Sequence, residues 1–163
     1  MSETKKTKSS LVPPEHCSLA KAFEKLGERW TLLIIRSALY GLTRFEEFQS
    51  ELGIPRTVLS QRLKRLCEQG IFERRPYKTP GTRQRMAYHL TPLGRELLLP
   101  FMGLTQWSDR WHDMAEQPTV CFKSRKTGEP LRIAMVDQNG RAVPDSDILA
   151  QLCSHLRAQK QAE

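Results

Sequence analysis

The sequence predicts a mainly α-helical fold with a small antiparallel β wing, extended at the C-terminus by a β-hairpin and a helix. Three observations lead to this expectation. An amphipathic helix is expected at about 56–69, and a basic hairpin at about 71–90 follows it after one glycine. A short helix and a tight turn precede the amphipathic helix, and two helices joined in this way form a helix-turn-helix. The combination predicts a winged helix-turn-helix.

Charge is concentrated in the same region. The chain has 163 residues, enough for one domain with extensions, and a formal net charge of +8. Residues 56–85 contain nine basic and two acidic residues, so this short segment carries nearly the whole excess. A solvated surface usually mixes signs, and a basic stripe therefore favours a patch that binds a polyanion.

Several classes of protein do not fit the sequence. No apolar run is long enough to cross a membrane, and no apolar segment follows the Lys-rich N-terminus as it would in a signal peptide, so we expect a cytoplasmic protein. The chain has four cysteines, which we expect to be reduced: Cys17, Cys67, Cys121 and Cys153. None of them forms a C-x-x-C pair, so a structural zinc site is not expected. The histidines are scattered and no Gly-rich phosphate loop occurs. We therefore predict that the protein is not an enzyme and that it has no catalytic residues, metal site or cofactor.

The N-terminal elements are predicted from composition and spacing. Residues 1–14 are polar and Lys-rich, and we interpret them as a disordered arm that either solubilises the chain or touches DNA phosphates. A helix is expected from Cys17 to Gly27, with Leu19, Phe23 and Leu26 spaced by four and three. The next helix begins at Trp30 and ends at Gly41. It is apolar almost all round and is expected to be the buried central helix.

The helix-turn-helix follows. A short helix is expected over 44–52, Gly53-Ile54-Pro55 forms the turn, and the next helix begins at about Pro55–Thr57. At about 100° per residue, the core stripe of this helix comprises Leu59, Leu63 and Leu66. The opposite face carries donors and acceptors suited to base edges or phosphates: Thr57, Ser60, Gln61, Lys64 and Arg65. Arg62 flanks the core stripe, which indicates a structural or phosphate-binding role.

The wing and the long helix complete the main domain, for which we expect the range 15–115. Gly70 is expected to cap the helix, Ile71–Pro76 and Gln84–Leu90 to be strands, and 78–83 to be the exposed tip. Thr91-Pro92 then begins a helix to about Met114, which Pro100 should kink. Its stripe is Leu97, Phe101, Leu104, Trp107, Trp111 and Met114. The tryptophans favour a dimer interface, the alternative being that they pack within the chain.

The remaining residues, 116–163, are expected to form an extension. Val120–Phe122 and 131–136 resemble strands of a hairpin, Asn139-Gly140 marks a further turn, and a helix is expected from Pro144 to about Ala158. The extension is too small to fold alone and should pack on the main domain or on a partner subunit.

At this level of detail the chain resembles the HxlR-type winged-helix transcriptional regulators of bacteria, relatives of the MarR type. The resemblance covers Cys17 to about Trp111. It rests on an ordered set of motifs: Cys17; Leu26-Gly27-Glu-Arg-Trp30-Thr-Leu-Leu-Ile-Ile35; Gly41; Arg44-Phe45-x-x-Phe48; Ile54; Val58-Leu59-Ser60-Gln61-Arg62-Leu63-x-x-Leu66; Gly70-Ile71; Arg75; and Tyr88-x-Leu90-Thr91-x-x-Gly94-x-x-Leu97. The common Ser-Pro start of the recognition helix is replaced by Pro55-Arg56, which leaves its N-cap open.

The resemblance implies a homodimer that binds double-stranded DNA at a pseudo-palindromic operator, with dimer contacts from helices at about 18–26 and 92–114. The expected dimer contacts are Leu19, Phe23, Leu97, Phe101, Leu104, Trp107 and Trp111. The expected DNA contacts are Arg44, Arg56, Thr57, Ser60, Gln61, Arg62, Lys64, Arg65 and, in the wing, Lys78, Thr82 and Arg83.

Cys17 matches an N-terminal cysteine with which several members of the family sense oxidants, quinones or aldehydes. It lies at a helix N-terminus beside His16 and one turn before Lys21, where the helix dipole and charge would favour a thiolate. The alternative is a small buried residue of the dimer interface with no redox role.

We therefore expect a dimeric, sequence-specific DNA-binding regulator, most simply a repressor, with a small-molecule effector as a possible further partner. A winged-helix module that binds protein without sequence-specific DNA binding is the alternative, although it would not need a basic patch. RNA binding is disfavoured because no aromatic residues interleave with the basic ones.

Overall fold

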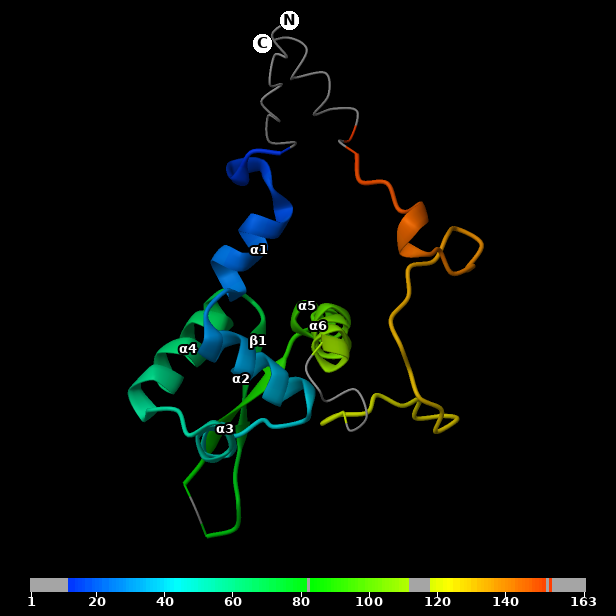
Figure 1. Cartoon of the computed structure of the whole chain (residues 1–163). Coiled ribbons are helices and arrows are strands. Elements are labelled where there is room, and N and C mark those ends of the chain that lie inside the picture. The colour runs from blue at the N-terminus through cyan, green and yellow to red at the C-terminus, as the bar shows by residue number, and fades with distance from the viewer. Residues whose placement is uncertain (1–11, 82, 112–117, 152, 154–163) are drawn as a thin grey trace, which may run out of the picture. The chain divides into compact units, whose positions relative to one another are not determined.

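The computed structural model describes residues 12–81, 83–111, 118–151 and 153, and these residues belong to two compact units (Figure 1). One unit runs from Glu28 to Ala134 and contains all the helices and strands of the predicted DNA-binding region after the first helix. The other combines the chain up to Gly27 with the chain from Met135.

Helix α2, Arg29–Leu39, supplies much of the core of the larger unit. Ile34, Ile35 and Ser37 are completely buried, and Thr31 is 4% exposed. The Ser37 hydroxyl satisfies its buried position by donating to the carbonyl oxygen of Leu33 at 2.9 Å. The expectation of a buried central helix is confirmed on this side, while Leu32 and Leu33 are only half-buried.

Helices α3, Phe45–Leu52, and α4, Arg56–Glu68, form the predicted helix-turn-helix. Gly53 ends α3 with a left-handed backbone (φ 60°), which a side chain would disfavour, and Ile54 of the turn is 2% exposed. Pro55 is the N-cap of α4 and no side chain caps this helix end. The start of α4 therefore depends on the fixed φ of proline rather than on a capping hydroxyl.

Helix α4 ends in a Schellman motif. The N–H of Ile71 donates to the carbonyl of Leu66 at 3.0 Å, the N–H of Gly70 donates to Cys67 at 3.0 Å, and Gly70 has a positive φ of 71°. This motif turns the chain directly into strand β1, Phe72–Tyr77, which pairs with β2, Arg85–Leu90, in an antiparallel register that opposes Phe72 to Leu90. The predicted strands are confirmed to within one residue at each end.

The base of the wing is attached to the core. Phe72 is 2% exposed and its ring meets Phe48 edge to face, with ring centroids 6.4 Å apart. On the other edge of β2, the N–H of Tyr88 donates to the carbonyl of Thr43 at 2.7 Å and Arg44 bridges to Ala87. The segment before α3 thus extends the two-stranded sheet by one bridge and fixes the wing relative to the helix-turn-helix.

The helix after the wing is divided in two. The expectation of one helix kinked at Pro100 is wrong in its position, because α5, Pro92–Glu96, ends four residues earlier and α6, Leu98–Trp111, follows after Leu97. A proline ring collides with the carbonyl four residues before it, here that of Glu96, so the helix breaks where that carbonyl lies. The predicted end at Met114 lies outside the described residues.

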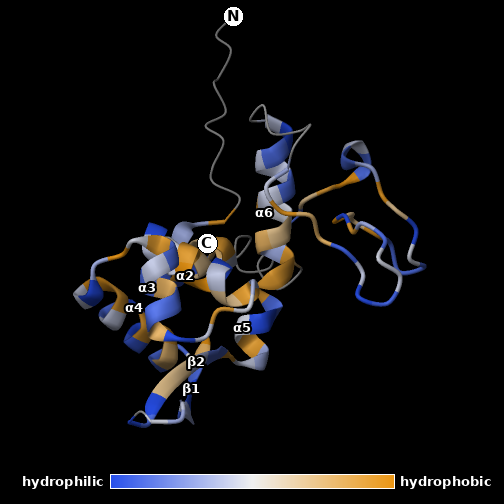
Figure 2. Cartoon of the chain, turned by 90° about the horizontal axis from the view of Figure 1, so that it is seen from below, coloured by the Kyte–Doolittle hydropathy of each residue, from blue (hydrophilic) through white to orange (hydrophobic). Residues whose placement is uncertain are grey.

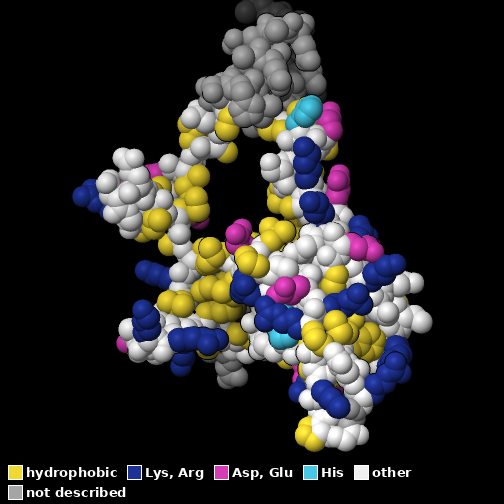
Figure 3. Space-filling model, turned by 180° about the vertical axis from the view of Figure 1, so that it is seen from behind, with side chains coloured by type: hydrophobic (Ala, Val, Ile, Leu, Met, Phe, Trp, Pro, Cys, Tyr) yellow, Lys and Arg dark blue, Asp and Glu magenta, His cyan; other side chains and the backbone are white. Residues whose placement is uncertain are grey.

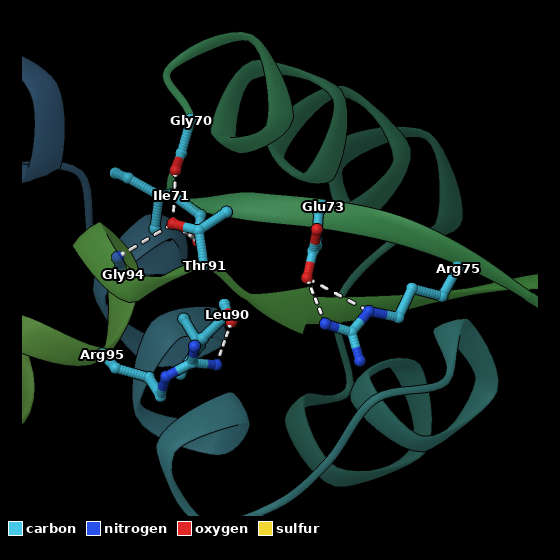
Figure 4. A network of polar contacts seen from close by, with 8 residues as sticks. All are labelled: Gly70, Ile71, Glu73, Arg75, Leu90, Thr91, Gly94 and Arg95. Carbon is cyan, nitrogen blue, oxygen red and sulfur yellow. Dashed lines mark hydrogen bonds and ion pairs between the residues drawn. The ribbon is translucent and has the colours of Figure 1, made fainter.

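The junction between the wing and α5 is held by Thr91 (Figure 4). Its hydroxyl donates to the carbonyl of Gly70 at 2.6 Å and accepts from the N–H of Gly94 at 3.1 Å, which makes it the N-cap of α5 as predicted. Gly94 packs so closely that a Cβ would lie 2.3 Å from the carbonyl oxygen of Ile71.

The segment after α6 in the larger unit has no strand among its described residues, which corrects the predicted hairpin. It forms one bridge, Lys123 to Pro130, with a hydrogen bond of 2.8 Å from Leu131 to Phe122. The Gln106 side chain of α6 binds the Leu131 carbonyl at 3.0 Å and the N–H of Ile133 at 2.9 Å. These two bonds occupy the backbone groups that a longer ladder would use.

The smaller unit contains α1, Ser18–Leu26, preceded by a 3-10 turn at Pro14–His16. From Met135 it contains the predicted Asn139-Gly140 turn, closed by a bridge between Val136 and Ala142. The predicted C-terminal helix is wrong in its first half: Asp145–Asp147 forms a 3-10 turn and the chain is extended at Ile148. Its second half, and residues 1–11 of the arm, lie outside the described residues.

Candidate nucleic-acid interface

Helix α4 has one buried face and one exposed polar face. Leu59 and Leu63 are completely buried and Leu66 is 1% exposed. All five residues of the predicted opposite face are exposed: Thr57, Ser60, Gln61, Lys64 and Arg65. The structure thus brings together on one helix face a hydroxyl pair, an amide and two cations, a set of groups able to bond base edges and phosphates.

Arg62 and Arg65 share one carboxylate. Glu28, the N-cap of α2, forms an ion pair with Arg62, and its other oxygen lies 3.5 Å from the guanidinium of Arg65. Arg62 is half-buried and its Nε is a buried donor without a partner. Arg62 therefore has a structural contact, whereas Arg65 remains exposed and bound at the longer distance.

Arg44 and Arg56 lie at the N-terminal ends of α3 and α4, and each stacks on an aromatic ring. The Arg44 guanidinium lies 4.8 Å from the centroid of Tyr77 on β1, and that of Arg56 lies 4.9 Å from Phe45. Both arginines are exposed. Such stacking orients a guanidinium without consuming its hydrogen bonds, although the Nε of Arg44 also lies 3.7 Å from a carboxylate oxygen of Glu47.

The wing tip is polar and turns at Gly81, whose φ is 77° (Figure 2). Lys78 and Arg83, predicted to bind DNA, are exposed on either side of it. Thr82 lies outside the described residues. The strands behind the tip carry two further ion pairs, Arg85 to Glu46 at 2.7 Å and Arg75 to Glu73 at 2.5 Å.

Two contributors to this surface were not predicted from the sequence. In the sequence, Glu28 belongs only to the Leu26–Ile35 motif, and Glu46 only to the short helix expected over 44–52. Both act on basic residues distant in sequence, Arg62 and Arg85, so no spacing rule connects them. The one available signal was the position of Arg62 beside a leucine stripe, where a buried guanidinium needs an acid.

The cysteines differ in environment. Cys67, on the half-buried side of α4, lines a cavity of about 330 Å³ with Arg74 and Tyr88, and burial raises the pKa of its thiol. Cys17 is half-buried at the N-cap of α1, and Cys121 and Cys153 are exposed. All four are free thiols.

The predicted dimer contacts divide by exposure. Leu19 and Phe23 of α1 are exposed in one unit, and Leu104, Trp107 and Trp111 of α6 are exposed in the other, with Trp111 reaching 73%. Leu97 and Phe101 are half-buried instead. Figure 3 shows hydrophobic side chains gathered in patches on the face seen from behind. The tryptophans Trp107 and Trp111 are exposed within the larger unit, and both the dimer interface and packing elsewhere in the chain remain predictions.

Among the described residues, no group of three or more His, Cys, Asp or Glu side chains is arranged to hold a metal ion. No helix in that part of the chain is both long and apolar enough to span a membrane.

Comparison with known proteins identifies the kind of molecule to which this surface belongs. Residues 25–116 match the family described as HxlR-like helix-turn-helix. The HTH-type transcriptional regulator Rv3095 of Mycobacterium tuberculosis is 42% identical over 112 residues, 69% of this chain and 70% of that protein. The HTH-type transcriptional regulator YodB of Bacillus subtilis is 34% identical over 108 residues, 66% of this chain and 93% of that protein.

Solved structures agree with these relatives. The crystal structure of PA1607, described as a candidate transcription factor, is 31% identical with a TM-score of 0.70 and covers 83% of this chain and 94% of that one. The reduced form of YodB is 33% identical with a TM-score of 0.50, over 60% of this chain and 95% of that one.

Proposed function

The chain belongs to the HxlR-like helix-turn-helix family, and on this premise we propose that it is a homodimeric repressor that places α4 in the major groove of a pseudo-palindromic operator. It is a bacterial-type HTH transcriptional regulator and not an enzyme. As a DNA-binding regulator it would act in the cytoplasm.

The division of α4 into a buried and an exposed face carries the proposal. The leucine stripe fixes the helix on the core, and the rotation that it imposes leaves Ser60, Gln61 and Arg65 exposed. Glutamine and arginine are the side chains that bond adenine and guanine edges in pairs of hydrogen bonds. Arg56 and Lys64, being exposed cations on the same helix, would bind the flanking phosphates.

The wing would contact the flanking backbone or the minor groove. Lys78 and Arg83 are exposed at its tip, and the Thr43–Tyr88 hydrogen bond of 2.7 Å supports a fixed angle between wing and helix-turn-helix. Arg44, stacked on Tyr77 between the two, would add a phosphate contact.

Dimerisation would use α1 and α6. Exposed Leu19 and Phe23, and exposed Leu104, Trp107 and Trp111, form the kind of aromatic and aliphatic surface that is costly to leave in water. Two recognition helices related by a two-fold axis would meet half-sites one helical turn apart, roughly 34 Å.

Cys17 is proposed as the sensing thiol. The relative YodB has been solved in a reduced form, and Cys17 is half-buried at the start of α1, beside the proposed dimer contacts. A modification at this position would act on the dimer rather than on α4 directly. The test is Cys17→Ser, which should abolish release from DNA by diamide or quinones; Cys121→Ser and Cys153→Ser, at exposed thiols, serve as controls.

The central experiment is a mobility shift on double-stranded DNA carrying the protein's own promoter. We expect Arg65→Ala with Arg83→Ala to weaken binding by at least tenfold and to lower the slope of log affinity against log salt by about one to two. The matched control removes two exposed lysines elsewhere, Lys123→Ala with Lys126→Ala, and should bind normally. Unchanged affinity of the arginine variant would overturn the docking and favour a protein-binding module.

A further inference from the structure

A cavity of about 370 Å³ lies in the larger unit, and none of its lining residues belongs to α4. It is lined by the end of α2 and the loop after it, by β2, and by the start of α6. Its apolar wall comes from Leu39, Leu42 and Leu98. A volume of this size is within the range of small-molecule sites, which combine apolar walls with a few convergent polar groups.

The polar groups of this cavity are all basic or neutral. Three arginines line it, Arg75 from β1, Arg95 from α5 and Arg125 from the segment after α6, and no carboxylate is among its lining residues. Three elements distant in sequence therefore contribute arginines to the lining of one cavity. Glu73, which pairs with Arg75, is not among the lining residues.

We propose that this cavity binds a small organic carboxylate with an apolar body, and that this ligand is the effector of the regulator. The first half stands on the cavity itself, while the second half rests on the proposed function.

The three arginines differ in the partners that they already have, which Figure 4 shows for Arg75 and Arg95. Arg75 donates twice to Glu73, at 3.1 and 2.5 Å, so its charge is already balanced. Arg95 donates one bond of 2.6 Å to the carbonyl of Leu90, which fixes its direction without neutralising it. Arg125 takes part in none of the ion pairs found in the described part of the chain. Two uncompensated guanidinium groups thus remain for an anion.

The ligand class follows from the combination of walls and charges. Arginine binds a carboxylate through two parallel N–H bonds, and such charge-assisted bonds are about twice as strong as neutral ones. Leu39, Leu42 and Leu98 would gain by covering an apolar group, at about 25 cal/mol per Å². A fully polar anion such as inorganic phosphate would leave these leucines unused. An aromatic or branched aliphatic carboxylate uses both.

The cavity lies where a ligand can act on the DNA-binding surface. Thr43 and Tyr88 both line it, and their 2.7 Å hydrogen bond joins the wing to the segment that leads into α3. Arg44, the next residue, is a proposed phosphate contact. His89 lines the cavity and pairs with Glu73 across the strands, so it shares a sheet face with Arg75. A ligand inserted here would press on β2 and alter the angle of the wing.

Binding is tested first without DNA, by titration calorimetry on the full, reduced protein. Sodium benzoate is the probe, and benzyl alcohol and sodium acetate are its matched analogues without the charge and without the ring. We expect benzoate to bind at least tenfold more tightly than either, and Arg125→Gln to weaken it at least tenfold (about 1.4 kcal/mol). Arg132→Gln, in the same segment but outside the lining, should leave it unchanged. Equal binding of all three probes, no binding, or an unaffected Arg125→Gln variant would overturn the site.

The effector role is tested by the operator shift with and without benzoate. We expect benzoate to lower the affinity for the operator at least fivefold. Operator DNA should lower the affinity for benzoate by the same factor, since coupling between two sites is reciprocal. Arg125→Gln should bind the operator normally in the absence of benzoate and lose the response. Benzoate binding without any change in DNA affinity would overturn the effector role alone. If Arg125→Gln weakens DNA binding by itself, the arginine contacts phosphate and the cavity is not a ligand site. If the wild-type protein does not bind the operator even without benzoate, the proposed function is overturned instead.

Discussion

A carboxylate oxygen of Glu28, at the start of α2, lies 3.5 Å from a guanidinium nitrogen of Arg65 on α4. One of the arginines proposed to bind DNA therefore forms an ion pair with an acid of the same chain. The same carboxylate pairs with half-buried Arg62. Glu28 therefore has two roles, because it neutralises Arg62 permanently and restrains Arg65 in the absence of DNA. If Arg65 binds DNA as proposed, this contact would place a cost on binding to random-sequence DNA, where Arg65 would have to leave Glu28 to reach a phosphate instead of a base edge.

Replacing Glu28 by glutamine should release Arg65. We expect affinity for random-sequence DNA to rise about three- to tenfold, because one repulsive charge is removed and one cation is freed, and the ratio of operator to random affinity to fall. Fluorescence anisotropy at two salt concentrations measures both. Glu129→Gln, an equal charge change at an exposed site, is the control. A variant with unchanged random-DNA affinity would contradict this role for Glu28.

Gly94 and Gly103 should respond in opposite directions to alanine. A Cβ at Gly94 would lie 2.3 Å from the backbone oxygen of Ile71, so Gly94→Ala must displace α5 from the wing and should cost about 1–3 kcal/mol. At Gly103, within α6, the nearest atom is the Ile133 methyl at 3.6 Å, and Gly103→Ala should stabilise by about 0.5–1 kcal/mol. Urea unfolding distinguishes the signs. Similar effects of both substitutions would show that the close approach at Gly94 is not what limits this position.

The sequence predicts what is local and periodic. The stripe of Leu59, Leu63 and Leu66, the Gly70 cap and the Thr91 cap follow from spacing and backbone preference, and each is confirmed. These features depend on residues within about one helical turn of one another. The polar face of α4 is the side of the helix opposite its buried leucine stripe, so its exposure could be predicted from the same spacing.

The features that the sequence did not predict depend on distant partners. Glu28 meets Arg62 from another helix, and Gln106 occupies the backbone of Leu131 and Ile133 that was expected to form a strand. The break at Leu97 was misplaced because the clash of Pro100 acts four residues upstream. The cavity beside β2 has no sequence signal, because its three arginines come from three elements.

Glu47 should make the start of α3 sensitive to acid. Its carboxylate accepts the backbone N–H groups of Thr43 at 2.9 Å and Arg44 at 2.8 Å, and these bonds lower the pKa of Glu47 below its ordinary value. A depressed folded-state pKa contributes stability that is present above the unfolded pKa and is lost as pH falls through the folded one.

The measurement is the free energy of unfolding of wild type and Glu47→Gln between pH 7 and pH 3. Wild type should be the more stable at pH 7, and the difference should shrink below about pH 4.5, where the unfolded carboxyl begins to bind its proton. Glu96→Gln, at an exposed acid of α5, provides the control and should give no such change. A difference that stays constant across this range would exclude the capping role.

The thiols should react in an order set by environment. Burial raises the pKa of Cys67, and since the thiolate is the nucleophile, Cys67 should be alkylated by iodoacetamide at least tenfold more slowly than exposed Cys121 and Cys153. Mass spectrometry of peptides over time gives the rates at each position. Alkylation of Cys67 at the rate of the exposed thiols would mean that the cavity beside Arg74 and Tyr88 opens readily to solvent.

The proposed dimer face on α6 makes the last prediction. Trp107 is 52% exposed in the single chain and would be buried in a dimer. Trp107→Glu therefore places a charge at a position that would be desolvated on dimerisation. A buried unpaired charge costs several kcal/mol, so the variant should sediment as a monomer at micromolar concentration, while its folded core remains intact because Trp107 supports little of it. Tyr40→Glu, at an exposed position at the end of α2 and outside the proposed dimer helices, is the matched control and should leave the dimer unchanged. Because a monomer can engage only one half-site, Trp107→Glu should also lose operator affinity while retaining most of its random-DNA affinity. A dimeric Trp107→Glu protein would exclude α6 as the interface.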